Sequence, residues 1–212
     1  MNYQQAKATT LLGMLRGLVP LRALSYYEAE RIAELQANRL RELLGISRAR
    51  LPEEAISQFP RVDVRRDTDM PVSGLTHWDR GRWLICLNAN EPEGRQRFSL
   101  AHEFKHVLDH TTKSRLYRDK PYLRAGDQAE RIADYFAGCL LMPKRHVKRL
   151  FGERLSLIRL SDAFGVTPRA MHVRLSQLGL VEPTPRCGLA GPLRGVETVY
   201  ERRPSGASRL AA

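Results

Sequence analysis

A His-Glu-x-x-His motif at residues 102–106 is the feature that most constrains this chain. Apolar residues surround it at helical spacing, from Phe98 to Leu108, which predicts a helix over about residues 95–110. Side chains four positions apart on a helix lie one above the other on the same face. His102 and His106 can therefore reach one zinc ion together, with Glu103 beside the water on that ion. The motif predicts a zinc site built on this helix.

A catalytic zinc ion usually has three protein ligands and one open position, so a third ligand is required. The best candidate is Glu130, in an amphipathic helix predicted over about residues 127–141, where a carboxylate also suits the helix dipole. Asp134 follows one turn later and is expected to accept a hydrogen bond from the outer nitrogen of a ligand histidine. Glu103 is expected to act as the general base that takes a proton from the zinc-activated water.

Alternative interpretations of the same residues stay open. In one alternative, His102 and His106 are ordinary helix residues that bind no metal. Against it, burying two histidines and a glutamate without a ligand costs free energy. His110 continues the spacing by one more turn and is expected to support or cap the helix rather than to bind metal. A further donor should stabilise the oxyanion formed during peptide hydrolysis. The sequence does not choose among Tyr117, Tyr122, His110 and His172 for this role.

The wider pattern predicts a mostly helical α+β chain with a small antiparallel sheet. The expected elements are helices at residues 27–44 and 52–60, strands at 62–64, 72–78 and 82–88, a helix at 95–110, a polar loop at 111–125, a helix at 127–141 and a helical hairpin within 155–181. The turn at residues 79–81 has hairpin chemistry. Residues 1–24 are expected to form a loose arm, 25–150 the main domain, 151–182 a hairpin packed on it, and 183–212 a disordered tail.

Charge and composition add weaker constraints. The 35 Lys and Arg against 23 Asp and Glu give a net charge of +12, which favours acidic partners or nucleic acid. Most of this charge is arginine, spread along the chain rather than gathered in one block, as a GC-rich genome would also produce. DNA is therefore a possible partner, but charge alone does not establish it.

Cysteines and apolar runs bear on the compartment. Cys86, Cys139 and Cys187 are widely spaced and odd in number, so they predict reduced thiols rather than a disulfide framework. No apolar run approaches the roughly 20 residues that span a bilayer. Arg16 interrupts the apolar segment at residues 11–20, which argues against a signal peptide. A cytoplasmic protein without membrane association is expected.

Two segments, at residues 95–106 and 130–143, together resemble the signature of the ImmA/IrrE metallopeptidase family. The resemblance covers about residues 27–181 and implies a zincin-like domain followed by a hairpin like a helix-turn-helix. By position it implies that His102, His106 and Glu130 bind Zn²⁺ and that Glu103 is the catalytic base. Family members often have glycine where this chain has Lys105, and a lysine there can point to solvent without disturbing the ligands. Many have asparagine at the position of Asp134.

The activity that this resemblance implies is a zinc-dependent, site-specific endopeptidase. Proteins of this kind typically cleave a helix-turn-helix repressor and so induce stress or mobile-element genes. The strand edge near residues 72–76 is expected to hold the substrate extended, by strand addition.

A rival interpretation rests on residues 160–175, whose spacing resembles a helix-turn-helix. In that case the chain is a DNA-binding regulator with a structural or sensory zinc, and Arg169, His172 and Arg174 face DNA. Three such side chains are few for a recognition helix, so a hairpin that supports the catalytic domain is favoured. A third possibility, an adaptor that keeps the fold without activity, is disfavoured by the intact motif at residues 102–106.

Overall fold

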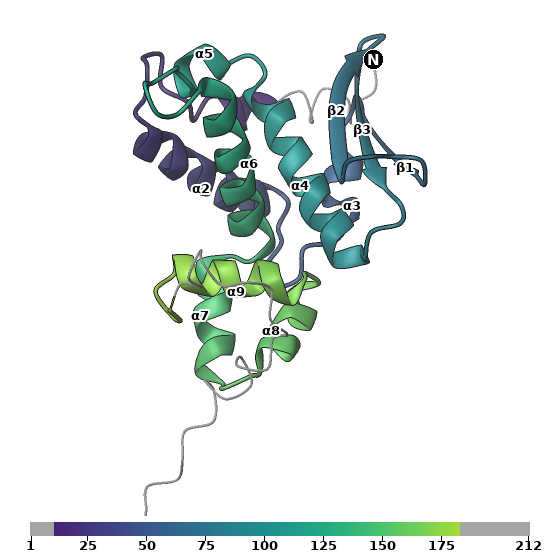
Figure 1. The fold of residues 1–212 in the computed structure, drawn as a ribbon, viewed down its shortest axis with the longest axis vertical. Helices are drawn as coiled ribbons and strands as arrows, with labels where there is room; N and C mark the ends of the chain where they lie inside the picture. The colour runs from purple at the N-terminus through teal and green to yellow at the C-terminus, as the bar shows by residue number, and fades with distance from the viewer. Residues whose placement is uncertain (1–10, 183–212) are drawn as a thin grey trace, which may run out of the picture.

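Helix α4, Glu93–Asp109, carries the histidine motif and lies between a small sheet and helix α6, Ala125–Leu141 (Figure 1). The computed structural model describes residues 11–182. In chain order its other elements are α2 Tyr26–Leu43, α3 Glu54–Ser57, β1 Val62–Asp67, β2 Gly74–Asp79, β3 Arg82–Asn88, α5 Lys113–Leu116, α7 Lys144–Gly152, α8 Leu157–Phe164 and α9 Pro168–Gln177. The mostly helical α+β class predicted from the sequence is confirmed, and each predicted strand is present.

The sheet is mixed rather than antiparallel, which corrects the sequence-based expectation. Its order is β1-β3-β2: β3 pairs antiparallel with β2 and parallel with β1. Strand β3 becomes central because Trp83, Ile85 and Leu87 alternate along it and are all buried, facing the core. The β2–β3 hairpin is formed as predicted, with positive φ angles of 45° at Arg80 and 83° at Gly81 in its two-residue turn.

Helix α6 packs against α2 on one side and against α4 on the other. On α2 the contact face is made of small buried residues, Ala29, Ala33 and Ala37, which let the two helix backbones approach. Helix α6 begins two residues earlier than predicted. Its buried face includes Ile132 and Phe136, which are fully buried. The position of Glu130 is therefore fixed by a helix that is packed along its whole length.

Residues 11–24 are packed against the core, so the expectation of a loose arm is wrong for this segment. Leu15, Val19 and Leu24 are buried. Arg16 donates hydrogen bonds to the carbonyl oxygens of Val107 and Leu108, at 2.8 and 3.1 Å, and so satisfies the last turn of α4. Residues 1–10 and the tail at 183–212 lie outside the described part of the chain. Within residues 11–182, no helix is long and apolar enough to cross a membrane.

The predicted helical hairpin is formed by α8 and α9. Gly165 adopts the left-handed conformation that ends α8, and the side chain of Thr167 caps α9 by accepting from the Ala170 N–H. The sequence analysis missed α7, a short basic helix that begins after Pro143. It missed this helix because only Val147 is fully buried there, so the apolar pattern is weak.

Candidate metal centre

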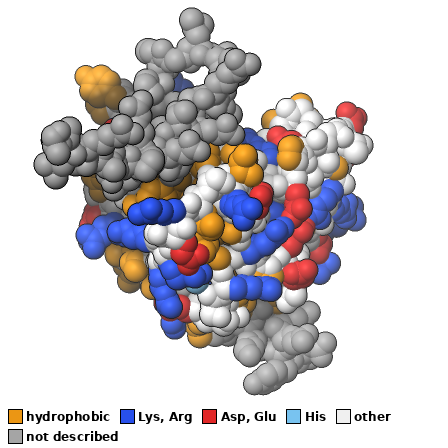
Figure 2. Space-filling view, turned by 90° about the horizontal axis from the view of Figure 1, so that it is seen from below, with side chains coloured by type: hydrophobic (Ala, Val, Ile, Leu, Met, Phe, Trp, Pro, Cys, Tyr) orange, Lys and Arg blue, Asp and Glu red, His pale blue; other side chains and the backbone are white. Residues whose placement is uncertain are grey.

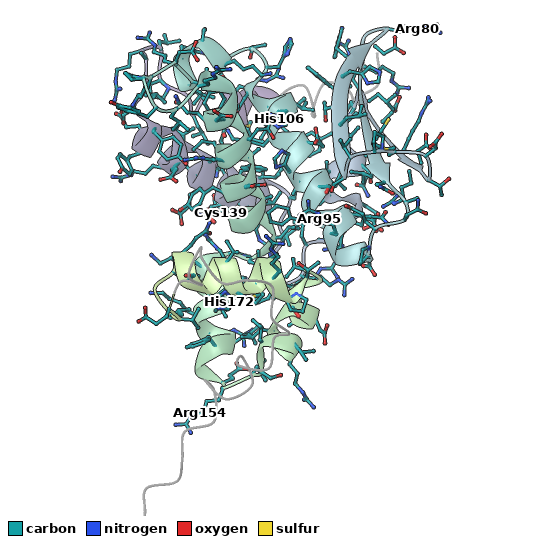
Figure 3. All side chains as sticks on the ribbon, in the orientation of Figure 1. Arg80, Arg95, His106, Cys139, Arg154 and His172 are labelled. Carbon is teal, nitrogen blue, oxygen red and sulfur yellow. The ribbon has the colours of Figure 1, made fainter. Side chains whose placement is uncertain are left out.

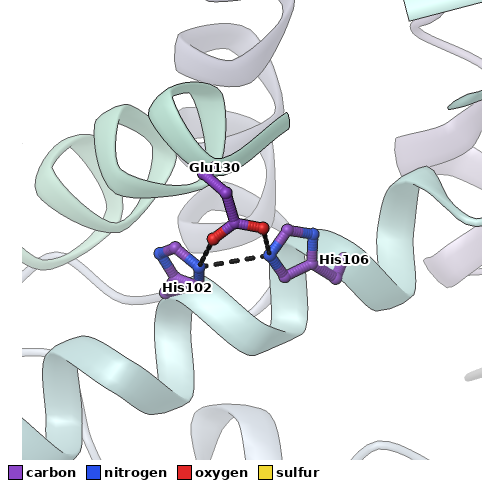
Figure 4. A group of neighbouring side chains, drawn as sticks. All are labelled: His102, His106 and Glu130. Carbon is purple, nitrogen blue, oxygen red and sulfur yellow. Dashed lines mark hydrogen bonds and ion pairs between the residues drawn. The ribbon is translucent and has the colours of Figure 1, made fainter. Parts of the chain in front are cut away.

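Three side chains from two helices converge at one point (Figure 4). The Nε2 atoms of His102 and His106 lie 3.1 Å apart. The two carboxylate oxygens of Glu130 lie 3.2 Å from the His102 Nε2 and 3.4 Å from the His106 Nε2. Helix α4 supplies both imidazoles because they are one turn apart, and α6 runs beside it and supplies the carboxylate. The structure thus brings together the three residues that the sequence predicts as ligands.

The donor set and its spacing fit a zinc ion. Two histidines and one glutamate are a common ligand set for catalytic zinc, with bonds of about 2.0–2.2 Å. Around a tetrahedral ion such bonds place the donor atoms about 3.3–3.5 Å apart. The observed separations of 3.1, 3.2 and 3.4 Å are close to these values. The three side chains are therefore placed so that they could hold one metal ion together.

Asp134 orients His102 in the way expected of it. Its carboxylate lies 2.9 Å from the His102 Nδ1, so that nitrogen carries the proton and Nε2 keeps a free lone pair. Burial by itself would lower the pKa of His102, but the hydrogen bond and charge of Asp134, with Glu103 and Glu130 nearby, outweigh burial and raise it. For His106, burial and the proximity of His102 lower the pKa.

Glu103 lies between α4 and the sheet, against strand β2. A methyl group placed on Gly74 would come within 3.1 Å of the Glu103 Cγ and 3.2 Å of its Oε1. A larger residue at position 74 would therefore press on the Glu103 side chain and require it to shift. The sequence analysis did not foresee this contact, because nothing in a single Gly74 indicates which side chain lies against it. Glu103 is buried and lies close enough to His102 and His106 for its charge to act on the pKa of both.

Lys105 does not point to solvent, which corrects the expectation drawn from the family pattern. Its side chain is 0% exposed, and its Nζ donates to Asp109 at 2.6 Å and to Gln36 at 2.8 Å. The hydroxyl of Tyr117 donates to the other oxygen of Asp109. Burial lowers the pKa of Lys105, and Asp109 opposes that effect. The opposite charges at residues 105 and 109 have the spacing of a helical ion pair, a signal that was available in the sequence.

The four proposed oxyanion donors differ in their surroundings. Tyr117 is bound to Asp109, and burial together with that carboxylate raises its pKa. Tyr122 is 99% exposed in the loop before α6. His110 packs edge-on against Trp83, with ring centres 4.8 Å apart. His172 lies on α9, outside the group of metal-binding side chains. The choice among these donors stays a prediction.

The residues expected to face DNA are not on a common open surface. Arg174 is 2% exposed, donates to the Met142 carbonyl oxygen at 3.1 Å and lies over the ring of Tyr135, so it is a packing residue. Arg169 is exposed, and His172 is half-buried. On the face that Figure 2 shows, Lys and Arg side chains are interspersed with Asp and Glu rather than gathered in one patch. The helical hairpin contacts α4 through the hydrogen bond from Arg97 to Gly165, and it contacts the end of α6 through the one from Arg174 to Met142.

Comparison with known proteins agrees with this architecture. The model of the IrrE N-terminal-like domain, a peptidase family, matches residues 56–176. A solved structure of a Mycobacterium tuberculosis transcriptional regulator is similar at a TM-score of 0.58 and 19% identity, over 77% of this chain and 50% of that one. The present chain thus spans about half the length of that regulator. No curated protein sequence gives a significant match.

A metal-binding group of side chains on two packed helices, within this α+β fold, is consistent with a metallopeptidase. Because the family model covers more than half of the sequence, the chain belongs to the IrrE N-terminal-like peptidase family. The ImmA/IrrE resemblance inferred from residues 95–143 is thereby confirmed.

Proposed function

We propose that this protein is a zinc-dependent endopeptidase that cleaves a helix-turn-helix transcriptional repressor. The observation that carries the proposal is the convergence of His102, His106 and Glu130 at separations suited to zinc, with Glu103 close enough for its charge to act on both histidines. Membership of a peptidase family supports hydrolysis of a peptide bond. The repressor as substrate is inferred from the family resemblance.

The protein residues have distinct tasks in this mechanism. His102, His106 and Glu130 would hold a zinc ion, which when bound would supply a water of lowered pKa and a Lewis acid for the scissile carbonyl. Glu103 Oε1 accepts the proton of the attacking water and later passes it to the leaving amine. Asp134 keeps the proton of His102 on Nδ1 and so keeps Nε2 available for binding. Gly74 allows the carboxylate of Glu103 to stay close to the sheet.

Strand β2 supports binding of an extended substrate. It is an edge strand, and within residues 11–182 only its β3 side is paired. Its first residue, Gly74, lies beside Glu103, so a peptide added along the free edge would pass close to the carboxylate. Backbone hydrogen bonds of this kind hold a peptide without demanding a particular sequence. Side chains elsewhere must then supply specificity.

A DNA-binding regulator with a structural or sensory zinc is the second candidate. The similar Mycobacterium tuberculosis protein is named a transcriptional regulator, and α7 carries exposed cations, among them Lys144, Arg145 and Lys148. The burial of Arg174 removes one of the expected DNA contacts. This candidate predicts a steep fall in DNA affinity with rising salt and no effect of Glu103→Gln.

The test compares the zinc-loaded protein with its Glu103→Gln variant. Both are incubated with a cell extract, and new protein N-termini are identified by mass spectrometry. The proposal predicts cleavage within a helix-turn-helix protein by the unaltered chain only, while both proteins hold equal zinc. Equal cleavage by the two proteins, or none by either, would contradict the peptidase proposal. The conservative surface change Asp127→Asn, on the first turn of α6, serves as the matched control and should leave cleavage unchanged.

A further inference from the structure

A groove reaches from Asp134, the hydrogen-bond partner of His102, to α9. It lies between α4, α6 and α9, has a volume of about 570 Å³, and its walls include Arg95, Phe98, Asp134, Arg169 and Val173. This volume is in the range of pockets that bind ligands or buried side chains. Figure 3 shows Arg95 on the part of α4 nearer to α9, and His106 farther along the same helix.

The groove adjoins the metal centre through one residue, Asp134. Asp134, which forms part of its wall, is the residue that binds His102 Nδ1 at 2.9 Å. Phe98 lies one helical turn before His102 and is half-buried. Arg95 lies seven positions before His102, which corresponds to about 10 Å along a helix. An extended polypeptide covers that distance in about three residues.

The walls of the groove are held by buried contacts. Arg97, on α4, donates to the carbonyl oxygens of Gly165 at 2.9 Å and Leu51 at 2.6 Å. A methyl group on Gly94 would lie 2.8 Å from the Val166 carbonyl carbon, so the start of α4 touches the turn before α9. Arg174 binds α9 to the end of α6 through Met142. The groove is therefore preformed, which reduces the entropic cost of binding.

Charge along the groove changes with distance from the metal. At the end near the metal centre, the groove is lined by the carboxylate of Asp134, which is hydrogen-bonded to His102. Farther out, Arg95 donates a hydrogen bond to the Ser73 hydroxyl at 3.1 Å and forms an ion pair with Glu91 at 3.7 Å, which partly neutralises its charge. Arg169 has no hydrogen-bond or ion-pair partner within residues 11–182. Among the described residues, Arg169 is thus a cation in the outer part of the groove that no acidic side chain neutralises.

An apolar surface lies beside this cation. Val173 follows Arg169 by one turn of α9, so both side chains lie on the same face, and Val173 is 49% exposed. Phe98 faces the groove from α4. Arg169 and Arg174, two of the three residues that would face DNA in a helix-turn-helix protein, line this groove, whereas His172 does not. Duplex DNA needs an open helix face, whereas a single extended chain fits between helices.

We infer that this groove binds the substrate polypeptide a few residues from the scissile bond. It accepts an acidic side chain at Arg169 and an apolar side chain between Phe98 and Val173. The inference rests on the proposed peptidase function and adds a specificity determinant to it. Strand β2 would hold the backbone, and Arg169 would select the sequence.

The test is cleavage of a peptide library by the zinc-loaded protein and by Arg169→Glu. The unaltered protein should favour Asp or Glu at one position, two to four residues from the cleaved bond. Arg169→Glu should lose this preference, with kcat/KM for acidic peptides reduced about tenfold to a hundredfold and neutral peptides little changed. Arg169→Lys should retain the preference. Arg159→Glu, an equal change of charge on the exposed side of α8, should behave like the unaltered protein.

Other outcomes separate this inference from the proposed function. An acidic preference that survives in Arg169→Glu, or no such preference in the unaltered protein, would overturn the groove assignment while peptidase activity stands. If no peptide is cleaved, the peptidase proposal fails, and the groove is judged by retention of the same library on immobilised protein. Acidic retention lost in Arg169→Glu would support the groove, and equal retention would overturn it. Loss of duplex DNA binding with unchanged peptide selection would assign Arg169 to DNA instead.

Discussion

Helix α4 carries two polar pairs at the same four-residue spacing, and the protein treats them in opposite ways. His102 and His106 face a partly open site with the carboxylate of Glu130, to which no lysine or arginine of residues 11–182 is bound. Lys105 and Asp109 are fully buried, and the lysine itself supplies the cation. The histidine pair is arranged to bind a metal ion, whereas the charges of Lys105 and Asp109 neutralise each other. Spacing alone does not separate the two cases; the surrounding charges do.

The largest predicted effect concerns the buried pair. Lys105→Met should lower the free energy of unfolding by about 3–5 kcal/mol, because it leaves the carboxylate of Asp109 buried without its cation. The double change Lys105→Met with Asp109→Asn should recover most of that loss, since an amide still accepts from Tyr117. Urea unfolding with EDTA present measures this without a contribution from metal. A loss below 1 kcal/mol in the single variant would show that the pair is not buried in solution.

The next effect concerns the open pair. Asp134→Ala should weaken zinc binding about tenfold to a hundredfold, because the His102 ring loses the acceptor that fixes its tautomer. Asp134→Asn should lose less, since its side-chain oxygen can still accept from Nδ1. Zinc affinity is measured by competition with a chromophoric chelator. Unchanged affinity in Asp134→Ala would mean that the hydrogen bond does not orient the ligand.

The smallest predicted effect concerns an exposed cluster at the start of α2, made of Arg22, Ser25 and Glu28. Ser25 caps α2, and Glu28 accepts from the Ser25 N–H and from Arg22. Ser25→Ala should lower the free energy of unfolding by about 1 kcal/mol. This can be measured by urea unfolding, and an unchanged midpoint would contradict it.

The same cluster predicts a pH dependence. The hydrogen bond from Arg22, followed by that from the Ser25 backbone, lowers the pKa of Glu28 from 4.5 to about 2. Its contribution to stability is therefore present above pH 4.5 and is lost as pH falls toward 2. The side-chain carboxyl resonance of Glu28 should titrate near pH 2 in an NMR experiment. A midpoint near 4.5 would show that the cluster is not formed.

The sequence predicts well where local spacing decides the structure. The motif at residues 102–106, the β2–β3 turn and the Thr167–Pro168 start of α9 each follow from rules that act over a few residues. Contacts between distant segments were not predictable in the same way. The parallel pairing of β1 with β3 and the packing of residues 11–24 depend on which apolar surfaces meet after folding.

The candidate site shows the same division. Glu130 was found because two helical patterns, each readable alone, were assumed to lie side by side. The Lys105 position was misjudged because an exposed lysine is the usual expectation, and its partners Gln36 and Tyr117 come from other elements. The groove at Arg169 required the position of α9 against α4, which rests on buried arginines that sequence spacing does not reveal.

The most direct test of the central claim is the zinc content of the purified chain. The unaltered protein and Glu103→Gln should each hold close to one zinc ion after reconstitution. Glu130→Ala should lose it or bind it far more weakly, while Asp127→Ala, on the same helix and exposed, should keep it. No zinc in the unaltered protein, or equal zinc affinity in Glu130→Ala, would contradict the three-ligand site on which the proposed mechanism depends.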